Sequence, residues 1–588
     1  MTKTSRKKAI VVGAGAGGIA TAARLAKCGF SVTVLEKNGF TGGRCSTIQH
    51  GGFRFDQGPS LLLLPKLFQE AFRDLDTTLE REGVELLRCA TNYAVWFADG
   101  DRFELTPDLA RMRAQVERYE GAGGFARYLA WLREAHDHYE LSVSEVLHRN
   151  FTSLLDLAAP SFVLAGLRLH PLHSVWGRAG RYFWTERLRR VFTFATMYMG
   201  MSPFDAPATY SLLQYSELTE GIWYPRGGFH GVLQALVEVG RRAGVEYRLD
   251  APVKRIITHE DGKTARGVEL ESGETLDADV VVVNADLVYA YSNLFPQTPS
   301  IRRYSESLKQ RDSSCSSISF YWALDRKVPE LQTHNIFLAD EYRESFDAIF
   351  DRKELPQEPS FYVNVPSRVD PSAAPEGCDT VIVLVPTGHL LQPKPGNSSG
   401  VGLPRQQDWP ALVNQAREAV LSTIEARTGS SLKESIIHET VNDPLTWEAR
   451  FNLDQRMYKA RLKTGLNQSG QGSILGLGHG FFNVLSFRPG TRARRLNNAY
   501  FVGASTHPGT GVPIVLAGAK ITTEQILGDF GMEIPWRRKR ETEGVERMGK
   551  SGKLDRIERP SSVLWNTVMC LLMVLWLALM FRYWTPLF

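Results

Sequence analysis

The chain has 588 residues, 43% of them hydrophobic and 23% charged, which excludes general disorder and predicts about two to four folded domains. Its 69 basic and 64 acidic residues nearly balance at a formal charge of +5, and no basic stripe marks the body of the chain, so nucleic acid is not an expected partner. Six scattered cysteines without a C-x-x-C pair argue against a disulfide framework and predict that no metal is bound.

The N-terminal segment reads as a strand, a glycine-rich turn, a helix and a second strand, over residues 9–37. Gly13 permits the sharp turn, Gly15 lets the backbone approach a pyrophosphate, and Gly18 allows close packing of helix and strand. The free N–H groups at the start of the helix then hold the phosphates. Glu36 closes the second strand, where a carboxylate accepts hydrogen bonds from a ribose, which favours FAD or NAD over NADP.

A second glycine pair and an arginine follow at Gly42, Gly43 and Arg44. Extended Rossmann flavoproteins carry such a pair, and their arginine helps to seat the diphosphate. The pattern therefore favours FAD over NAD, the alternative being an ordinary glycine turn with a surface arginine.

The next long segment, from about residue 61 to residue 218, has apolar residues at helical spacing and is expected to be largely helical. Within it, residues 151–184 are rich in leucine, alanine and aromatics, and they form either core or an entrance that dips into a membrane surface. Strand patterns with turn signals return between about residues 245 and 285, and residues 314–391 mix strands and helices.

The last globular element, residues 497–527, again reads as strand, glycine turn and helix. Gly503 and Gly511 let the backbone run beside a planar ring, and Pro513, directly after Val512, is expected at the first position of the helix, where its missing N–H costs nothing. A helix N-terminus aimed at the pyrimidine end of a flavin stabilises the negative charge of the reduced ring. The alternative is a tight turn before a packing helix.

Residues 563–581 form an apolar run of the length that spans a bilayer as a helix, with Asn566 and Thr567 as the clearly polar members. Four basic residues between positions 550 and 559 precede the run, and Arg582 follows it, which predicts a cytosolic body. We therefore expect a single-pass tail anchor in an endomembrane such as the endoplasmic reticulum. The alternative is an amphipathic or core helix.

Together these segments resemble the fungal and bacterial-type phytoene desaturases, which are amine-oxidase-like flavoproteins. The resemblance covers about residues 8–527 and rests on the N-terminal fingerprint, GGRC with GFRFDQGPS, MYMGMSPFDAPATYSLLQY, GIWYPRGGF, NADLVYAY, SFYVNVPSRVDPSAAPEG and FVGASTHPGTGVPIVLAGAK. The last of these is highly specific. Residues 454–471 depart from the family pattern, which runs from an FNL-type segment almost directly into GSILGL, and they are either a surface loop or a retained intron.

The resemblance implies FAD as cofactor and a long acyclic C40 carotenoid as substrate, held in an apolar tunnel near membrane lipid. It implies stepwise desaturation of 15-cis-phytoene through phytofluene, ζ-carotene and neurosporene to lycopene, with a further step to 3,4-didehydrolycopene left open. Each round would move a hydride to the flavin and a proton to an acceptor, for which Asp205 and His507 are the candidates. Oxygen, a quinone or NAD would reoxidise the flavin, and a homo-oligomer is left open.

The chain has no H-E-x-x-H pattern. The stretches GNSSG (residues 396–400) and GVERMGKS (residues 544–551) match the spacing of a nucleophile elbow and a P-loop, but they lie in a polar loop and a charged linker without a preceding strand, so neither motif is expected. His507 and His479 lie near glycine turns and are acid–base candidates, although a lone histidine is more often structural. Two other functions stay open: a different flavin oxidoreductase, such as an amine oxidase or a retinol-type saturase, and a non-catalytic prenyl-chain binder like the dissociation inhibitors of small GTPases. The binder predicts loss of the flavin contacts, which this sequence retains.

The predicted fold class is α/β, with a Rossmann-type FAD-binding domain of the extended, amine-oxidase-like kind, a mixed α+β substrate domain and a C-terminal transmembrane helix. The FAD-binding domain is expected to be assembled from three separated segments, with a helical, membrane-facing part of the substrate domain between the first two. The expected boundaries are 1–95, 219–300 and 481–530 for the FAD-binding domain, 96–218 and 301–480 for the substrate domain, 531–562 for a charged linker and 563–581 for the transmembrane helix.

Overall fold

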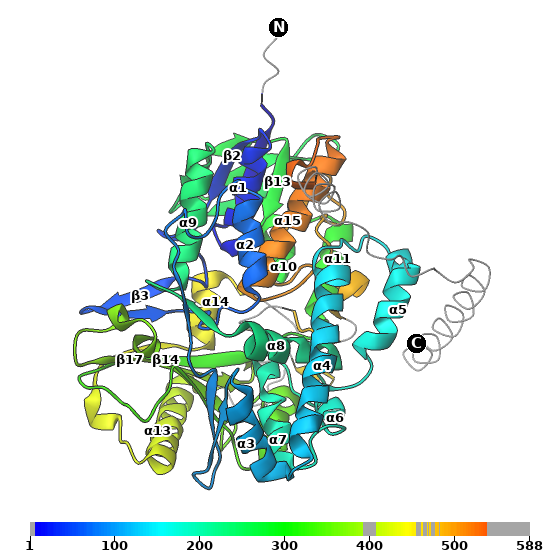
Figure 1. Ribbon diagram of the computed structural model, residues 1–588. Coiled ribbons are helices and arrows are strands. Elements are labelled where there is room, and N and C mark those ends of the chain that lie inside the picture. The colour runs from blue at the N-terminus through cyan, green and yellow to red at the C-terminus, as the bar shows by residue number, and fades with distance from the viewer. Residues whose placement is uncertain are drawn as a thin grey trace, which may run out of the picture.

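The computed structural model describes residues 6–391, 407–453 and 483–537, with the short pieces 460–461, 467–468, 470–471 and 477–480. Two lobes stand one above the other, with the N-terminus at the top of the upper lobe (Figure 1). The expected spanning segment and most of the expected linker lie outside the described residues, as does most of the 454–471 insertion. Among the described residues, none of the helices is both long and apolar enough to cross a bilayer.

The upper lobe is built on a parallel sheet. Within the described residues its five strands have the order β23-β13-β1-β2-β9, and every pairing between them is parallel. Parallel strands are covered on both faces, and accordingly the four valines of β13 and the last four residues of β1 are all buried. The strand bounds are β1 Lys8–Val12, β2 Ser31–Leu35, β9 Glu246–Arg248, β13 Val280–Val283 and β23 Ala499–Phe501.

Helices cover one face of this sheet and a small antiparallel sheet covers the other. Ala9 and Val11 of β1 pack with the helices, whereas Ile10 and Val12 pack with the small sheet, because alternate residues of a strand point to opposite faces. The helical layer is α1 Ala16–Lys27, α2 Pro65–Arg73, α9 Phe229–Arg242 and α15 Val512–Asp529, and the other layer is β10 Val253–Thr258, β11 Ala265–Leu270, β12 Thr275–Asp277, α10 Leu287–Tyr289 and α11 Pro299–Lys309. The predicted Rossmann-type α/β architecture is confirmed.

The lower lobe holds a mixed sheet. In the part of the chain that is described, seven strands have the order β19-β14-β17-β16-β15-β6-β7, and the β15–β6 pair is parallel while its neighbours are antiparallel. Helix α13 (Trp409–Thr428) packs on one face, where it contacts β14 and shares a buried hydrophobic cluster with β14, β16 and β17. The bounds are β6 Tyr93–Trp96, β7 Arg102–Leu105, β14 Ser316–Leu324, β15 His334–Phe337, β16 Phe361–Asn364, β17 Asp379–Thr387 and β19 Ile436–Asn442.

Helices between residues 109 and 215 form the flank of the lower lobe and, apart from the helix at residues 160–169, they share a core with β6 and β7. They are α3 Leu109–Glu120, α4 Gly124–Ser142, α5 Pro160–Leu169, α6 Val175–Ala179, α7 Glu186–Val191 and α8 Leu212–Tyr215. The expectation of a largely helical segment from residue 61 to 218 missed strands β5 (Leu86–Arg88), β6 and β7. Strand β6 is buried at all four positions, so it lacks the alternation that marks a half-exposed strand. The boundary expected at residue 95 falls inside β6, and the domain limits as a whole stay a prediction.

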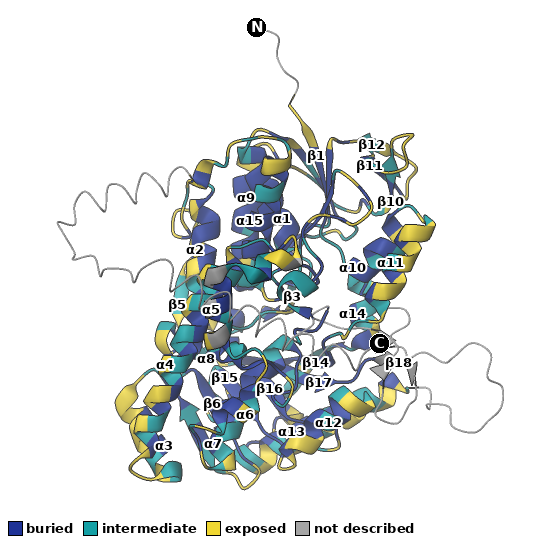
Figure 2. Ribbon diagram, turned by 90° about the vertical axis from the view of Figure 1, so that its right-hand side faces the viewer, coloured by how far each residue is buried: buried dark blue, intermediate teal, exposed yellow. Residues whose placement is uncertain are grey.

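Short elements complete the described part of the chain. They are β3 Thr47–His50, β4 Phe53–Asp56, β8 Trp223–Pro225, β18 Leu390–Leu391, β20 Ala460–Arg461, β21 Asn467–Gln468, β22 Gly470–Gln471, α12 Tyr342–Asp347 and α14 Pro444–Phe451. Buried residues fill the interior of both lobes, and exposed residues lie on the outer helices and loops (Figure 2).

Candidate functional site

A large cavity runs from the carboxyl ends of the parallel strands in the upper lobe to the mixed sheet of the lower lobe. Its volume is about 1630 Å³, larger than the roughly 300–1,000 Å³ of most small-molecule sites. Ligands of open α/β sheets bind outside the carboxyl ends of the strands, which is where its upper end lies. Of the residues expected to bind the cofactor, those that line the cavity are Gly13, Gly15, Glu36, Gly43, Arg44, Gly503, Gly511, Val512 and Pro513.

The first glycine turn joins β1 to α1. Gly13 has φ +99°, and a Cβ at this position would lie 2.7 Å from the carbonyl oxygen of Asn284. Gly15 precedes α1, and no side chain caps the N–H groups at the start of this helix. Gly18 lies outside the cavity lining, and a Cβ there would lie 2.1 Å from the Gly13 carbonyl oxygen. The turn thus leaves space and free N–H donors for a phosphate, as expected of this fingerprint.

Glu36 follows β2 and its carboxylate is held by neighbouring donors. The Ala14 N–H donates to Oε2 at 2.8 Å, and the backbone and side-chain nitrogens of Asn38 donate to Oε1 at 2.9 and 2.8 Å. These bonds fix the carboxylate at the cavity wall, and Oε2, which accepts one of them, keeps a lone pair for a further donor. Its position agrees with the predicted ribose contact, which stays a prediction.

Arg44 lies half-buried at the cavity wall, after a turn formed by Gly42 (φ +101°) and Gly43 (φ +59°). Burial lowers the pKa of its guanidinium, and the nearby charge of Asp286 acts in the opposite direction. The side chain of Asp286 accepts from the N–H groups of Val288 and Tyr289, both at 3.0 Å, and it also lines the cavity. Asp286 was not among the predicted site residues, although its place just after a buried parallel strand was a usable signal.

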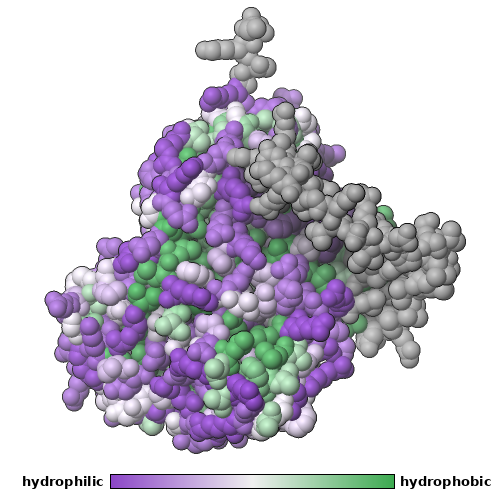
Figure 3. Space-filling view, viewed as in Figure 1, coloured by the Kyte–Doolittle hydropathy of each residue, from purple (hydrophilic) through white to green (hydrophobic). Residues whose placement is uncertain are grey.

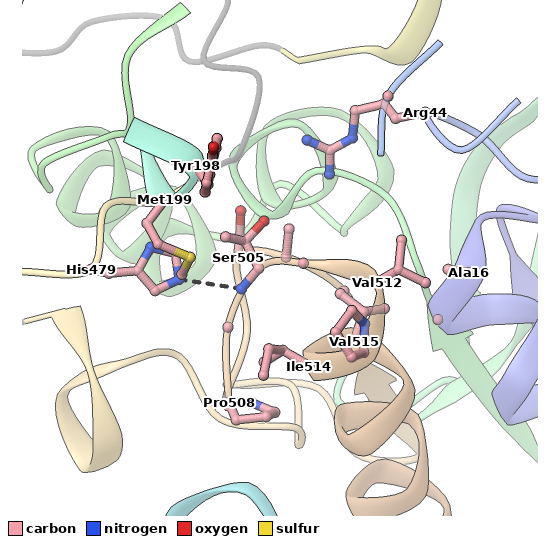
Figure 4. A pocket seen from close by; sticks show the side chains of 18 of the residues that line it. Ala16, Arg44, Tyr198, Met199, His479, Ser505, Pro508, Val512, Ile514 and Val515 are labelled. Atoms are coloured by element: carbon pink, nitrogen blue, oxygen red, sulfur yellow. Dashed lines mark hydrogen bonds between the residues drawn. The ribbon is translucent and has the colours of Figure 1, made fainter. Parts of the chain in front are cut away.

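The C-terminal loop and the start of α15 form another wall of the cavity (Figure 4). Gly503, Gly509 and Gly511 all have positive φ, and a Cβ at Gly509 would lie 2.8 Å from Nε2 of His479. The helix begins at Val512, so Pro513 is its second residue rather than the first, and it remains within the turn whose N–H groups have no intrahelical partner. This helix start supplies donors and a partial positive charge to the cavity.

The lower part of the cavity is mainly apolar. Its floor is formed by the sheet residues Ser319, Tyr362 and Leu384, which are direct cross-strand neighbours on β14, β16 and β17. Its side walls include Leu157, Phe162, Leu169, Phe204, Leu212, Leu213 and Leu485. A ligand in this part would be held by shape and burial of apolar surface.

Behind the floor lies a group of buried hydroxyls and one buried acid. The Tyr93 hydroxyl donates to Glu217 at 2.9 Å, and burial raises the pKa of Glu217 to about 8, so this side chain is mostly neutral at pH 7. Burial also raises the pKa of Tyr198, whose ring lines the cavity. The wall beside the apolar chamber therefore carries no net charge from these groups at neutral pH.

The three acid–base candidates occupy different places. Asp205 lies in an exposed loop at the edge of the cavity. His507 is outside the cavity lining: its Nε2–H donates to the Arg149 carbonyl at 2.8 Å, and burial lowers its pKa to about 4. His479 lines the cavity and accepts at Nε2 from the Thr510 N–H at 3.2 Å. Roles in proton transfer for Asp205 and His507 stay a prediction.

Among the described residues, Glu134, His138 and His170 bring ligand atoms within 4.8 Å of one another. The carboxylate of Glu134 is already bound by Arg178 at 2.5 and 2.7 Å and by the Tyr182 hydroxyl at 2.6 Å. A metal would have to displace this guanidinium, so the arrangement suits an ion-paired network better than a metal centre.

The site fits a dinucleotide cofactor: the turn at Gly13 leaves space that a Cβ would fill, the Glu36 carboxylate is held at the wall, and the helices α1 and α15 begin at the cavity. These features define a nucleotide-binding oxidoreductase of the α/β class. The family model of the flavin-containing amine oxidoreductases matches residues 16–389. The phytoene desaturase of Neurospora crassa is 61% identical over 94% of this chain and 90% of its own length, and that of Cercospora nicotianae is 54% identical over 99% and 100%. An oxidoreductase structure from Methanosarcina mazei shares the fold, with a TM-score of 0.55 and 16% identity, over 88% of this chain and all of that one.

The chain belongs to the flavin-containing amine oxidoreductases and, within them, to the phytoene desaturases. Its cofactor is FAD, as the sequence predicted. The predicted amine-oxidase-like fold of the FAD-binding part is confirmed.

Proposed function

We propose that this chain is a FAD-dependent phytoene desaturase that dehydrogenates 15-cis-phytoene stepwise through phytofluene, ζ-carotene and neurosporene to lycopene, with 3,4-didehydrolycopene as a further product of the same site. The observation that carries the proposal is the continuity of the cavity, which joins a dinucleotide cradle to an apolar chamber. A carotenoid has no group for hydrogen bonding, so an apolar chamber suits it. In this cavity the flavin would contact the hydrocarbon substrate where water is excluded.

The chain's own residues divide the work of holding the cofactor. The turn at Gly13 and Gly15 and the start of α1 would hold the diphosphate, Glu36 the ribose, and Arg44 with Gly43 the diphosphate from the other side. Gly503, Gly511 and the first turn of α15 at Val512 and Pro513 would lie beside the ring system. FAD supplies, when bound, an acceptor for the hydride of an allylic carbon.

The apolar walls exclude water and align the substrate carbon to be oxidised. Removal of a hydride and of a proton from the adjacent carbon leaves a new double bond, and the developing charge spreads over the polyene, so a weak acceptor suffices for the proton. Asp205 and His507 remain the candidates from the sequence. Asp205 lines the cavity and its exposed position allows release to solvent, whereas His507 lies outside the cavity lining. Oxygen, a quinone or NAD is the terminal electron acceptor in this proposal.

The test is expression of the full chain in a phytoene-producing bacterium. We expect the purified protein to be yellow with flavin absorbance and the host to turn orange or red, because each added double bond lengthens the conjugated chain. Chromatography of the pigments at successive times gives the number of steps. A host that stays colourless while the protein retains FAD would contradict the proposal and favour oxidation of a different substrate, such as an amine.

We further propose that the cavity opens toward a lipid surface near α5. Leu172, just after α5, lines the cavity and is 65% exposed, and Leu155, in the turn before α5, is 80% exposed. Exposed leucines also occur elsewhere, such as Leu109 on α3, and hydrophobic surface on the face of Figure 3 lies in separate patches. What distinguishes Leu172 is its continuity with the cavity, through which a substrate dissolved in lipid could enter. The tail at residues 563–581 would keep this opening near the membrane.

Removing every residue after Ser562 is expected to move most of the protein from the membrane pellet to the supernatant. The truncated protein should still float with phosphatidylcholine vesicles, and the pair Leu155→Glu and Leu172→Glu should abolish this residual binding. Leu109→Glu, also on an exposed leucine, is the matched control and should leave flotation unchanged. If the truncated protein does not bind vesicles, or if the control abolishes binding as well, the opening near α5 does not face lipid.

A further inference from the structure

Arg488 is a buried cation placed behind the loop that forms the C-terminal wall of the cavity. Its side chain is 2% exposed and forms no ion pair among the described residues. All five of its N–H groups donate to backbone carbonyl oxygens instead. These are Thr506 (Nε, 3.1 Å), Gly478 and Asn483 (Nη1, 3.0 and 2.8 Å), Leu477 (Nη2, 3.2 Å) and Ala504 (Nη2).

Burying the Arg488 guanidinium costs free energy because the charge loses its hydration. Burial lowers the pKa of its guanidinium to about 10, which still leaves the charge in place at neutral pH. A buried charge without a counter-ion costs free energy unless every polar atom is bonded, and here the carbonyl dipoles take the role of the counter-ion. The fixed fork of the guanidinium also joins Leu477, Gly478 and Asn483 to residues 504–506, which are separate from them in sequence.

The bond to Ala504 determines which way the next peptide faces. In a planar trans peptide, the carbonyl of residue 504 and the N–H of residue 505 point in opposite directions. Since the carbonyl is turned to Arg488, the Ser505 N–H is turned away from it, and this N–H has no acceptor among the hydrogen bonds of the described residues. Ser505 lines the cavity, where it lies between His479 and the first turn of α15 (Figure 4).

We infer that Arg488 is a positioning residue for the redox reaction: it holds the 504–505 peptide so that the Ser505 N–H is presented to a polar edge of the flavin. The positive charge of Arg488 polarises the 504–505 peptide. The Ser505 N–H then stabilises the negative charge that reduction places on the flavin ring. The inference rests on FAD as the bound cofactor and does not depend on which carotenoid is oxidised. Its test therefore needs no phytoene.

The experiment compares Arg488→Gln and Arg488→Lys with the wild type in two measurements, the dissociation constant for FAD and the midpoint potential of the bound flavin. Arg488→Gln should bind FAD about tenfold more weakly, the worth of one hydrogen bond, and its flavin should have a lower midpoint potential. Arg488→Lys keeps the charge with three donors in place of five, so its potential should fall between those of the glutamine variant and the wild type.

Arg427→Gln is the matched control. The Arg427 side chain is also buried and donates to two backbone carbonyls, of Trp96 and Leu338. Unlike Arg488 it also pairs with Glu358, and it lies at the mixed sheet, outside the cavity lining. It should lower the melting temperature without changing either flavin measurement. Unchanged affinity and potential in Arg488→Gln overturn the inference. If that variant does not fold, the same result for Arg488→Lys, with a lowered melting temperature, overturns it equally.

Discussion

Replacing Gly13 with alanine is expected to yield a folded protein that binds FAD more weakly. The backbone at this position has φ +99°, which costs a residue with a side chain about 1–3 kcal/mol, and the new Cβ would lie 2.7 Å from the Asn284 carbonyl oxygen. The turn must therefore shift, and it carries the N–H groups that hold the diphosphate. A loss of 1–3 kcal/mol in binding weakens the FAD dissociation constant by about 5- to 150-fold. Titration of the apoprotein with FAD, followed by flavin fluorescence, measures this change.

Gly29 offers a matched control for this substitution. It follows α1 with φ +91°, close to the value at Gly13, but a Cβ there would meet no atom within 4 Å. Gly29→Ala thus introduces similar backbone strain outside the cavity lining and should lower the melting temperature while the affinity for FAD stays that of the wild type. Equal loss of FAD in both variants would show that general destabilisation, not the shape of the cradle, is responsible.

The cofactor end of the site could be predicted because its chemistry is concentrated in short segments. Gly13, Gly15 and Glu36 lie within one strand–turn–helix–strand unit, where the spacing alone determines which groups meet. The first turn of α15 carries its own signal in Gly511 and Pro513. In each case backbone geometry that glycine permits, rather than contact with distant residues, places the binding groups.

The substrate end could not be predicted in the same way. Ser319, Tyr362 and Leu384 lie on three different strands. Successive side chains of each strand point to opposite faces of the sheet, and the sequence does not show which face of the sheet lines the cavity. Arg488 is a single arginine in a loop, and its five acceptors are backbone carbonyls, which leave no trace in the sequence. His507 was a candidate because it lies near glycine turns, but its ring bonds to the Arg149 carbonyl, outside the cavity lining.

Replacing Leu384 with aspartate is expected to abolish desaturation while FAD remains bound. Leu384 lies on β17 in the middle of the mixed sheet, between β14 and β16. Its side chain forms part of the cavity floor, and it is half-buried while the other residues of β17 are buried. A carboxylate there must be desolvated when a hydrocarbon fills the chamber, at a cost of several kcal/mol. We expect kcat/KM for phytoene to fall at least about 10³-fold, measured with the reconstituted enzyme in lipid.

Two further variants at the same position separate charge from shape. Leu384→Met conserves volume and apolarity and should retain most activity, since such exchanges usually cost less than about 1.5 kcal/mol. Leu384→Asn has the size of the aspartate without its charge and should lose less activity than Leu384→Asp. An apolar chamber raises the pKa of the introduced carboxyl, so the aspartate variant should recover toward the asparagine variant as the pH falls and the carboxyl becomes neutral. If aspartate and methionine variants desaturate phytoene equally well, the hydrocarbon does not lie on this floor, and the substrate must enter the cavity along another wall.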